Sequence, residues 1–225
     1  MPPKPQTPNE STLSAYYWVR LGAEVQSRGL PFALRDLSSD TRNQLAGDVH
    51  AAVRDRAVLI EFKRDFAGWT SEQTKRQYAP IMARIKEDLV AVSKAAHWFA
   101  WGNIGAEPGG EPIKFAPYVT LVDRDQESIT RETRSLSAYV QSQCTPLTPE
   151  EPVGADLRSY AGYVKRITDA ARGSAASESS TVLLWAVWGP DGALDIGSVG
   201  TWGDLRPMLS LPGSPVARFL RALRQ

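Results

Sequence analysis

Residues 45–65, LAGDVHAAVRDRAVLIEFKRD, decide the fold, because two short apolar segments lie here on either side of three charged residues. The two segments, residues 48–53 and 57–63, have the apolar and β-branched composition of strands and are predicted to form a β-hairpin. Glu61 and Lys63 interrupt the second segment. Alternate side chains of a strand project from the same face about 6.6 to 6.8 Å apart. Glu61 and Lys63 are therefore expected to share one face of the hairpin.

The apolar pattern also predicts how the two strands pair. With a loop of two or four residues, Val53 pairs with Arg56 and Asp48 lies directly across from Glu61. A shift by one residue would mix apolar and charged side chains on both faces, which disfavours it. The expected apolar face carries Val49, Ala51, Val53, Val58, Ile60 and Phe62, and the charged face carries Asp48, His50, Glu61 and Lys63.

A charged face of this kind has two interpretations. Two neighbouring carboxylates repel each other unless a cation lies between them, and their hard oxygen ligands suit Mg²⁺ or Mn²⁺. A bound cation together with the nearby ammonium of Lys63 could support phosphodiester cleavage. The alternative is an edge hairpin with a solvated outer face, where Glu61 and Lys63 make ordinary surface contacts that contribute little.

Asp48 followed by Glu61-Phe62-Lys63 resembles the D...ExK signature of the PD-(D/E)xK superfamily of nucleases. The family core has the element order α-β-β-β-α-β, and the resemblance covers roughly residues 12–123. It implies an α/β fold with a restriction-endonuclease-like core, in which helices flank a mixed sheet. It further implies that Asp48 and Glu61 bind Mg²⁺ or Mn²⁺, and that Lys63 is the catalytic lysine.

The chain departs from the family pattern at two places. Gly47 precedes Asp48 where the signature has Pro, and Gln73 lies five residues before Tyr78 where the exonuclease-like members have a Q-x-x-x-Y spacing. The second departure weakens an assignment to the exonuclease branch. We still expect that Gln73, Lys75 and Gln77 contact phosphate groups of nucleic acid.

Glu24 is a further candidate for the catalytic site, because some family members carry a metal-binding acid on the first helix. It lies three residues after Leu21, near the apolar stripe that Leu13, Tyr17, Leu21 and Val25 form at four-residue spacing on that predicted helix. The alternative is that Glu24 belongs to a charge ladder with Arg20 and Arg28 at four-residue spacing, which is typical of a solvated helix face.

Periodicity and turn residues predict the remaining elements, with an α/β sandwich around a mixed sheet as the overall result. A disordered tail is expected at residues 1–11, the nuclease-like core at 12–123, and a C-terminal elaboration packed on it at 124–225. Pro80 should kink or delay the longest helix. The expected helices are residues 12–28, 70–94, 132–143, 156–172 and 215–224, and the other expected strands are 97–101, 118–122, 181–188 and 193–199, with connections at 30–47 and 102–117.

Composition excludes several classes of protein. Lys and Arg total 26 against 25 Asp and Glu, so the formal charge of +1 gives no support for nucleic-acid binding and does not exclude it. Cys144 is the only cysteine, which excludes an internal disulfide framework and a thiolate zinc cluster. His50 and His97 are expected to be structural groups, and the tryptophans to pack in the core rather than stack on bases. No apolar stretch approaches the length of a membrane span, so we expect a cytoplasmic protein without membrane contact.

The function expected from this reading is hydrolysis of phosphodiester bonds by a Mg²⁺-dependent nuclease acting on nucleic acid, with DNA as the favoured substrate. The resemblance implies a setting in defence, restriction or repair. The alternative is a catalytically inactive module on the same fold, in which residues 124–225 bind a protein partner or a second copy of the chain.

Overall fold

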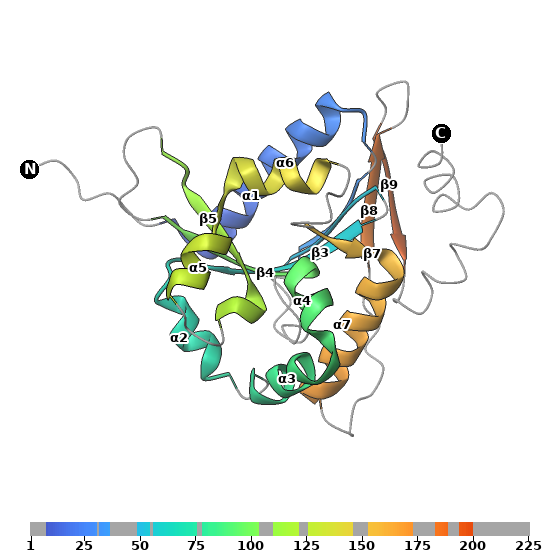
Figure 1. The fold of residues 1–225 in the computed structure, drawn as a ribbon. Helices are drawn as coiled ribbons and strands as arrows, with labels where there is room; N and C mark the ends of the chain where they lie inside the picture. Colours follow the sequence, from blue (N-terminus) through green and yellow to red (C-terminus); the bar gives the residue numbers. More distant parts are fainter. Residues whose placement is uncertain are drawn as a thin grey trace, which may run out of the picture.

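The strand that carries Glu61 and Lys63, β3 (Arg56–Lys63), lies in the interior of a mixed sheet, and all eight of its residues are buried. The computed structural model describes residues 8–30, 32–36, 49–54, 56–75, 78–103, 110–121, 126–145, 153–172, 183–188 and 194–199. Helices cover both faces of the sheet, so the molecule is an α/β protein (Figure 1). The expectation that Glu61 and Lys63 could lie on a solvated edge hairpin is wrong, because β3 has neighbours on both sides and helices above and below.

The strands are hydrogen-bonded in the order β6-β5-β4-β3-β2-β1-β8-β9, and β7 pairs with β3 outside this path. Only β3 and β4 are parallel among the pairs that the described residues form; the other pairs are antiparallel. The remaining strands are β1 (Phe32–Asp36), β2 (Val49–Val53), β4 (His97–Gly102), β5 (Ile113–Pro117), β6 (Arg134–Ser135), β7 (Ala155–Asp156), β8 (Leu183–Trp188) and β9 (Leu194–Val199).

The β2–β3 hairpin has the register that the apolar pattern predicts. Val53 pairs with Arg56 and Val49 with Ile60. Arg54, in the tight turn between the strands, has a φ of 56°, in the left-handed region that non-glycine residues adopt uncommonly. The prediction that Asp48 lies opposite Glu61 concerns a residue outside the described part of the chain.

One face of the sheet packs against α1 (Glu10–Ser27) and α6 (Leu136–Cys144). All six residues predicted for the apolar face of the hairpin belong to this core cluster, as does the predicted helical stripe of Leu13, Tyr17, Leu21 and Val25. Tyr17 fixes α1 to α6, because its hydroxyl donates a 2.9 Å hydrogen bond to Oε1 of Gln143. Helix α1 begins earlier than expected, since Asn9 caps it by accepting a hydrogen bond from the amide of Thr12.

The opposite face carries a second core made by α2 (Gly68–Gln73), α3 (Tyr78–Arg84), α4 (Val90–Ala96), α5 (Gln126–Glu132) and α7 (Leu157–Arg172). Tyr118, Trp69 and Phe99 lie at its centre, with ring centroids 5.1 to 5.2 Å apart at the Trp69 contacts. Glu61 and Lys63 of β3 point into this face, where helices rather than solvent meet them.

Three expectations for residues 30–122 are wrong. The connection at 30–47 contains β1, which the sequence does not announce because the strand is only five residues long. The single helix at 70–94 is divided into α2, α3, a π-helical turn (Ile85–Leu89) and α4, with Pro80 in the first turn of α3, where its missing amide removes no helical bond. The strand at 118–122 is a 3-10 helix, Tyr118–Leu121, and its place beside β4 is taken by β5 within the expected loop.

The C-terminal half extends the same sheet. Strand β7 pairs with β3, and β8 pairs with β1, while the predicted β8–β9 hairpin and the α7 helix are both present. Helix α6 begins at Leu136, later than expected, because the side chain of Ser135 caps it after the short strand β6. The helix predicted at 215–224 lies outside the described residues. Within the described part of the chain, no helix combines the length and apolarity needed to cross a bilayer.

Candidate functional site

Glu61 and Lys63 lie side by side on the buried second face of β3, as their spacing predicts. The ammonium of Lys63 donates a 2.6 Å hydrogen bond to Oε1 of Glu61 and a 2.9 Å hydrogen bond to the carbonyl of Phe62. Glu61 is 3% exposed and Lys63 is 7% exposed, so the ion pair is almost removed from water. Such a pair is costly to bury unless further groups satisfy it.

Two residues from the α2 region complete this cluster. Nζ of Lys75 lies 2.7 Å from Oε1 of Glu61 and 2.5 Å from Oε2 of Glu72, and so bridges the two carboxyls. Oε2 of Glu72 is also 3.7 Å from Nζ of Lys63. We call Glu61, Lys63, Glu72 and Lys75 the Glu61 cluster. With every group ionised, its two acids and two amines sum to no net charge.

Sequence reasoning missed Glu72. Its signal was present but weak: Glu72 is three residues after Trp69, so it shares the buried face of α2, and it is three residues before Lys75. What the sequence does not show is that α2 lies against the end of β3. Lys75 was predicted to contact phosphate groups. In the structure, its ammonium forms ion pairs with Glu61 and Glu72.

The stem of Lys63 is held by a close approach of α2. An added Cβ on Gly68, the first residue of α2, would lie 2.8 Å from Cβ and 3.0 Å from Cγ of Lys63. The amide of Gly68 donates to Oδ1 of Asp65, which anchors the start of the helix. The absence of a side chain at position 68 therefore permits α2 to pack directly on the lysine.

The two carboxyls of the cluster have different proton affinities. Burial raises the pKa of Glu61, but the ammonium groups of Lys63 and Lys75 outweigh burial and lower the pKa to about 2. Burial, together with repulsion from Glu61 and a hydrogen bond to it, raises the pKa of Glu72 to about 7. At neutral pH, Glu61 is ionised and Glu72 exchanges a proton readily. Neighbouring acids with widely different pKa values are typical of functional sites, although structural ion pairs also produce such differences.

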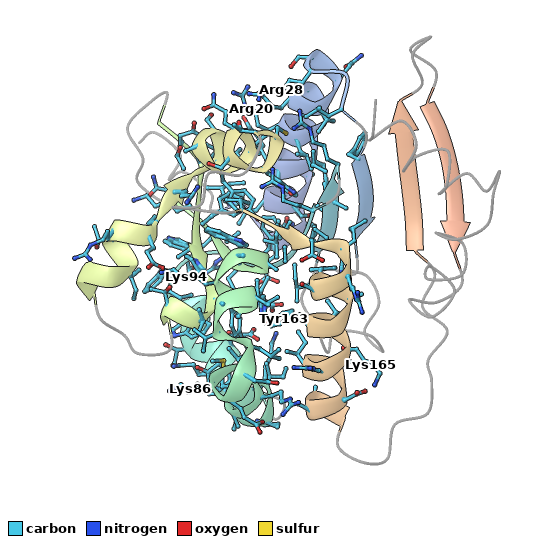
Figure 2. All side chains as sticks on the ribbon, turned by 45° about the vertical axis from the view of Figure 1, so that its right-hand side comes forward. Arg20, Arg28, Lys86, Lys94, Tyr163 and Lys165 are labelled. Carbon is cyan, nitrogen blue, oxygen red and sulfur yellow. The ribbon has the colours of Figure 1, made fainter. Side chains whose placement is uncertain are left out.

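Tyr118 and His97 support Glu72 from the interior. The hydroxyl of Tyr118 donates a 3.1 Å hydrogen bond to Oε1 of Glu72, and its ring stacks on His97 with centroids 4.0 Å apart. Nδ1 of His97 is 2.6 Å from the hydroxyl of Tyr163, which donates to Oγ of Ser93. Figure 2 shows Tyr163 of α7 beside α4. Burial lowers the pKa of His97 to about 3, so the ring is neutral and acts as a fixed structural group.

His50 takes part in a second buried contact with α7. Its Nδ1 lies 2.6 Å from the hydroxyl of Tyr160, which also donates a 3.1 Å hydrogen bond to the carbonyl of Val58. Two tyrosines one helical turn apart on α7 thus fix the two histidines of the second face.

The other predicted site residues lie in different places. Glu24 forms an ion pair of 2.5 Å with Arg28 on the same helix, as the charge-ladder alternative describes. The acid of the first helix that approaches Lys63 is Glu10, whose Oε1 lies 4.0 Å from Nζ. Gln73 is the last residue of α2, and Asp48 and Gln77 lie outside the described residues.

The carboxylate oxygens of the cluster are of the type that binds a hard divalent cation, but the described residues supply only two acids. Glu61 and Glu72 contribute carboxylate oxygens, the ligand type that Mg²⁺ and Mn²⁺ prefer. Oε2 of Glu72 is buried, and no described residue gives it an aligned hydrogen bond; its 2.5 Å contact with Lys75 is an ion pair. Within the described residues, no group of three acids, histidines or cysteines is arranged around one point.

Comparison with known proteins gives no relative: no family model, curated protein or solved structure matches the chain.

Proposed function

We propose that this chain is a metal-dependent nuclease of the PD-(D/E)xK kind, which hydrolyses phosphodiester bonds, with DNA as the favoured substrate. The observation that carries the proposal is the buried pair of Glu61 and Lys63 at the end of β3, with Nζ 2.6 Å from Oε1. An acid and an amine two residues apart on a central strand are what the ExK signature requires. Ion pairs without a functional role are rarely buried on a central strand, because burial of charge is costly.

The element order supports the proposal. From α1 the chain passes through β1, β2 and β3, then through α2, α3 and α4 to β4. This is the α-β-β-β-α-β order of the family core. The first strand of that order, β1, emerges only from the structure, since the sequence indicated two strands before the long helical region. The parallel pairing of β3 and β4 brings the helical crossover back over the face that carries the Glu61 cluster.

The chemistry assigned to the side chains follows from their charges. Glu61 is ionised at neutral pH and would hold Mg²⁺ or Mn²⁺ together with Asp48, which the sequence predicts to lie across from it. The Lys63 ammonium would orient the attacking water and stabilise the charge that develops on the phosphate. After losing its own proton to solvent, the neutral amine would accept the proton of that water. The cation, when bound, supplies Lewis-acid stabilisation of the phosphoryl oxygens. Lys75 and Gln73, at the exposed end of α2, would meet the nucleic-acid backbone.

A cleavage assay tests the proposal. Purified full-length protein is incubated with supercoiled plasmid, linear DNA and RNA, each with Mg²⁺, Mn²⁺ or chelator. We expect metal-dependent cleavage that falls about 10² to 10⁴-fold in Lys63→Met, the range of a lost proton-transfer group. Met preserves the stem that packs on Gly68. Lys165→Met is the matched control, since Lys165 is exposed on α7 and pairs only locally with Asp169 (Figure 2). Metal-dependent cleavage that survives Lys63→Met unchanged refutes the assignment.

A second candidate function is a catalytically inactive nuclease fold that binds a protein partner. The observation that favours it is the neutral balance of the Glu61 cluster, in which two ammonium groups already satisfy Glu61. In that case calorimetry finds no Mn²⁺ binding, and the protein forms a homodimer or hetero-complex in solution. Mn²⁺ binding that Glu61→Gln abolishes favours the nuclease instead.

A further inference from the structure

Lys75 occupies the position between two carboxyls that a bridging cation would take. Its Nζ lies 2.7 Å from Oε1 of Glu61 and 2.5 Å from Oε2 of Glu72. Both acids are nearly buried, with 4% and 8% of their side chains exposed. Two like charges this close and this dry repel strongly unless a cation or a proton lies between them. In the structure Lys75 provides it.

Lys75 differs from the other amine of the cluster in its freedom to leave. The Lys63 side chain is 9% exposed, its stem is pressed against Gly68, and its ammonium also donates to the carbonyl of Phe62. The Lys75 side chain is 31% exposed and stands after the end of α2, where the chain is no longer helical. Rotation about its stem would therefore carry the ammonium toward solvent.

We propose that Lys75 is an exchangeable counter-ion, which holds Glu61 and Glu72 together while no divalent cation is bound and moves into solvent when such a cation binds between them. The inference rests on the metal dependence proposed above, and it adds Glu72 to the residues that meet the cation. Lys63 remains in place and keeps its contact with Glu61.

Electrostatics requires this exchange. A divalent cation and an ammonium within a few ångströms repel strongly in a buried site, and both seek the same oxygens. Oε2 of Glu72 has no aligned hydrogen bond from the described residues, so it loses only the ion pair with Lys75 when the cation arrives.

Amine labelling with and without metal measures the exchange. Full-length protein is treated with an acetyl succinimidyl ester, with Mn²⁺ saturation first established by calorimetry, and labelled lysines are quantified by peptide mass spectrometry. We expect acetylation of Lys75 to rise several-fold on Mn²⁺ binding, because the released amine is accessible to the reagent. Labelling of Lys165 should be unchanged, and Lys63 should stay protected. Wild-type protein suffices, so the test does not depend on the folding of a variant.

The outcomes separate this inference from the proposed function. Mn²⁺ binding without increased labelling of Lys75 overturns the inference. An absence of Mn²⁺ binding overturns both the inference and the metal-dependent nuclease. Mn²⁺ binding with release of Lys75 but without cleavage of any nucleic acid supports the inference and refutes the nuclease.

A variant gives an independent check. Lys75→Met removes the competing ammonium and should tighten Mn²⁺ binding about tenfold or more, as expected from the loss of a charged hydrogen bond in the metal-free state. Lys165→Met should bind Mn²⁺ like the wild type. Weaker binding by Lys75→Met would show that the ammonium assists the cation rather than competing with it, and would overturn the proposal.

Discussion

Replacing Glu72 by Gln should remove a pH dependence of stability that the Glu61 cluster builds into the fold. Gln is similar in size and cannot titrate. In the wild type, burial and the neighbouring carboxylate raise the pKa of Glu72 from 4.5 to about 7. The folded protein therefore binds this proton more tightly than the unfolded chain does. Stability from this group is fully present below about pH 4.5 and is lost as pH rises through about 7.

The size of the effect follows from the two pKa values. At about 1.4 kcal/mol per pKa unit, the free energy of unfolding contributed by Glu72 falls by about 3 kcal/mol between the two ends of this window. That is a large part of the 5 to 15 kcal/mol by which domains are typically stable. Glu61 acts in another window: its pKa is lowered to about 2, so its contribution is present above about pH 4.5 and is lost below it.

His97 makes a comparison between variants necessary. Burial lowers the pKa of His97 to about 3, so its contribution is lost as pH falls from about 6.5, which opposes the slope from Glu72 over much of the same range. The wild-type curve alone is therefore nearly flat there. The difference between wild type and Glu72→Gln isolates the acid.

Urea unfolding followed by tryptophan fluorescence provides the assay. The difference in unfolding free energy between wild type and Glu72→Gln should change by about 3 kcal/mol from about pH 4.5 to about pH 7.5. Glu87→Gln is the control, because Glu87 is exposed on the π-helical turn and, among the residues that the structure describes, forms its ion pair with Arg84. Its difference from wild type should stay nearly constant with pH. An equally constant difference for Glu72→Gln would refute the raised pKa of Glu72 in the folded protein.

Three further substitutions test the packing around the site. Gly68→Ala should lower nucleic-acid cleavage by about 10²-fold, because its Cβ would displace Lys63, although Ala itself favours the helix; unchanged cleavage would count against the role of this contact. Tyr118→Phe should lower the unfolding free energy by about 1 to 3 kcal/mol in urea, since an acceptor on Glu72 loses its donor, and an unaffected midpoint would contradict the hydrogen bond. Phe62→Ala should cost about 3 to 5 kcal/mol in the same assay, because Phe62 is 1% exposed in the first core, and a cost below about 1 kcal/mol would contradict its burial there.

Local periodicity in the sequence determined a substantial part of the fold. The two-residue period of the hairpin fixed its register, because any other pairing would bury charge among apolar side chains. The four-residue stripe of α1 and the strongly amphipathic pattern of α7 likewise identified helices and their buried faces. These elements share one property, which is that neighbouring residues alone decide which side faces the core.

Other elements became evident only in the tertiary structure. Strand β1 is short and exists because β2 and β8 pair with it on both sides. Strand β5, within a stretch rich in Gly and Pro, is formed by pairing with β4 and displaces the expected strand at 118–122. Pairing partners distant in the sequence override weak local propensity at each of these places.

The candidate site divides in the same way. The sequence by itself determined that Glu61 and Lys63 share a face, because alternate side chains of a strand always do. It did not determine that this face is buried, or that Glu72 and Lys75 meet it. Those contacts depend on how α2 packs across the end of β3. Glu72 and Lys75 lie eleven and fourteen residues after Glu61 in the sequence, yet Nζ of Lys75 is 2.7 Å from Oε1 of Glu61 in the fold. Only the folded chain brings the second acid and the second amine into one buried cluster. There, ion pairs between residues distant in the sequence replace the water that burial removes from the charged groups.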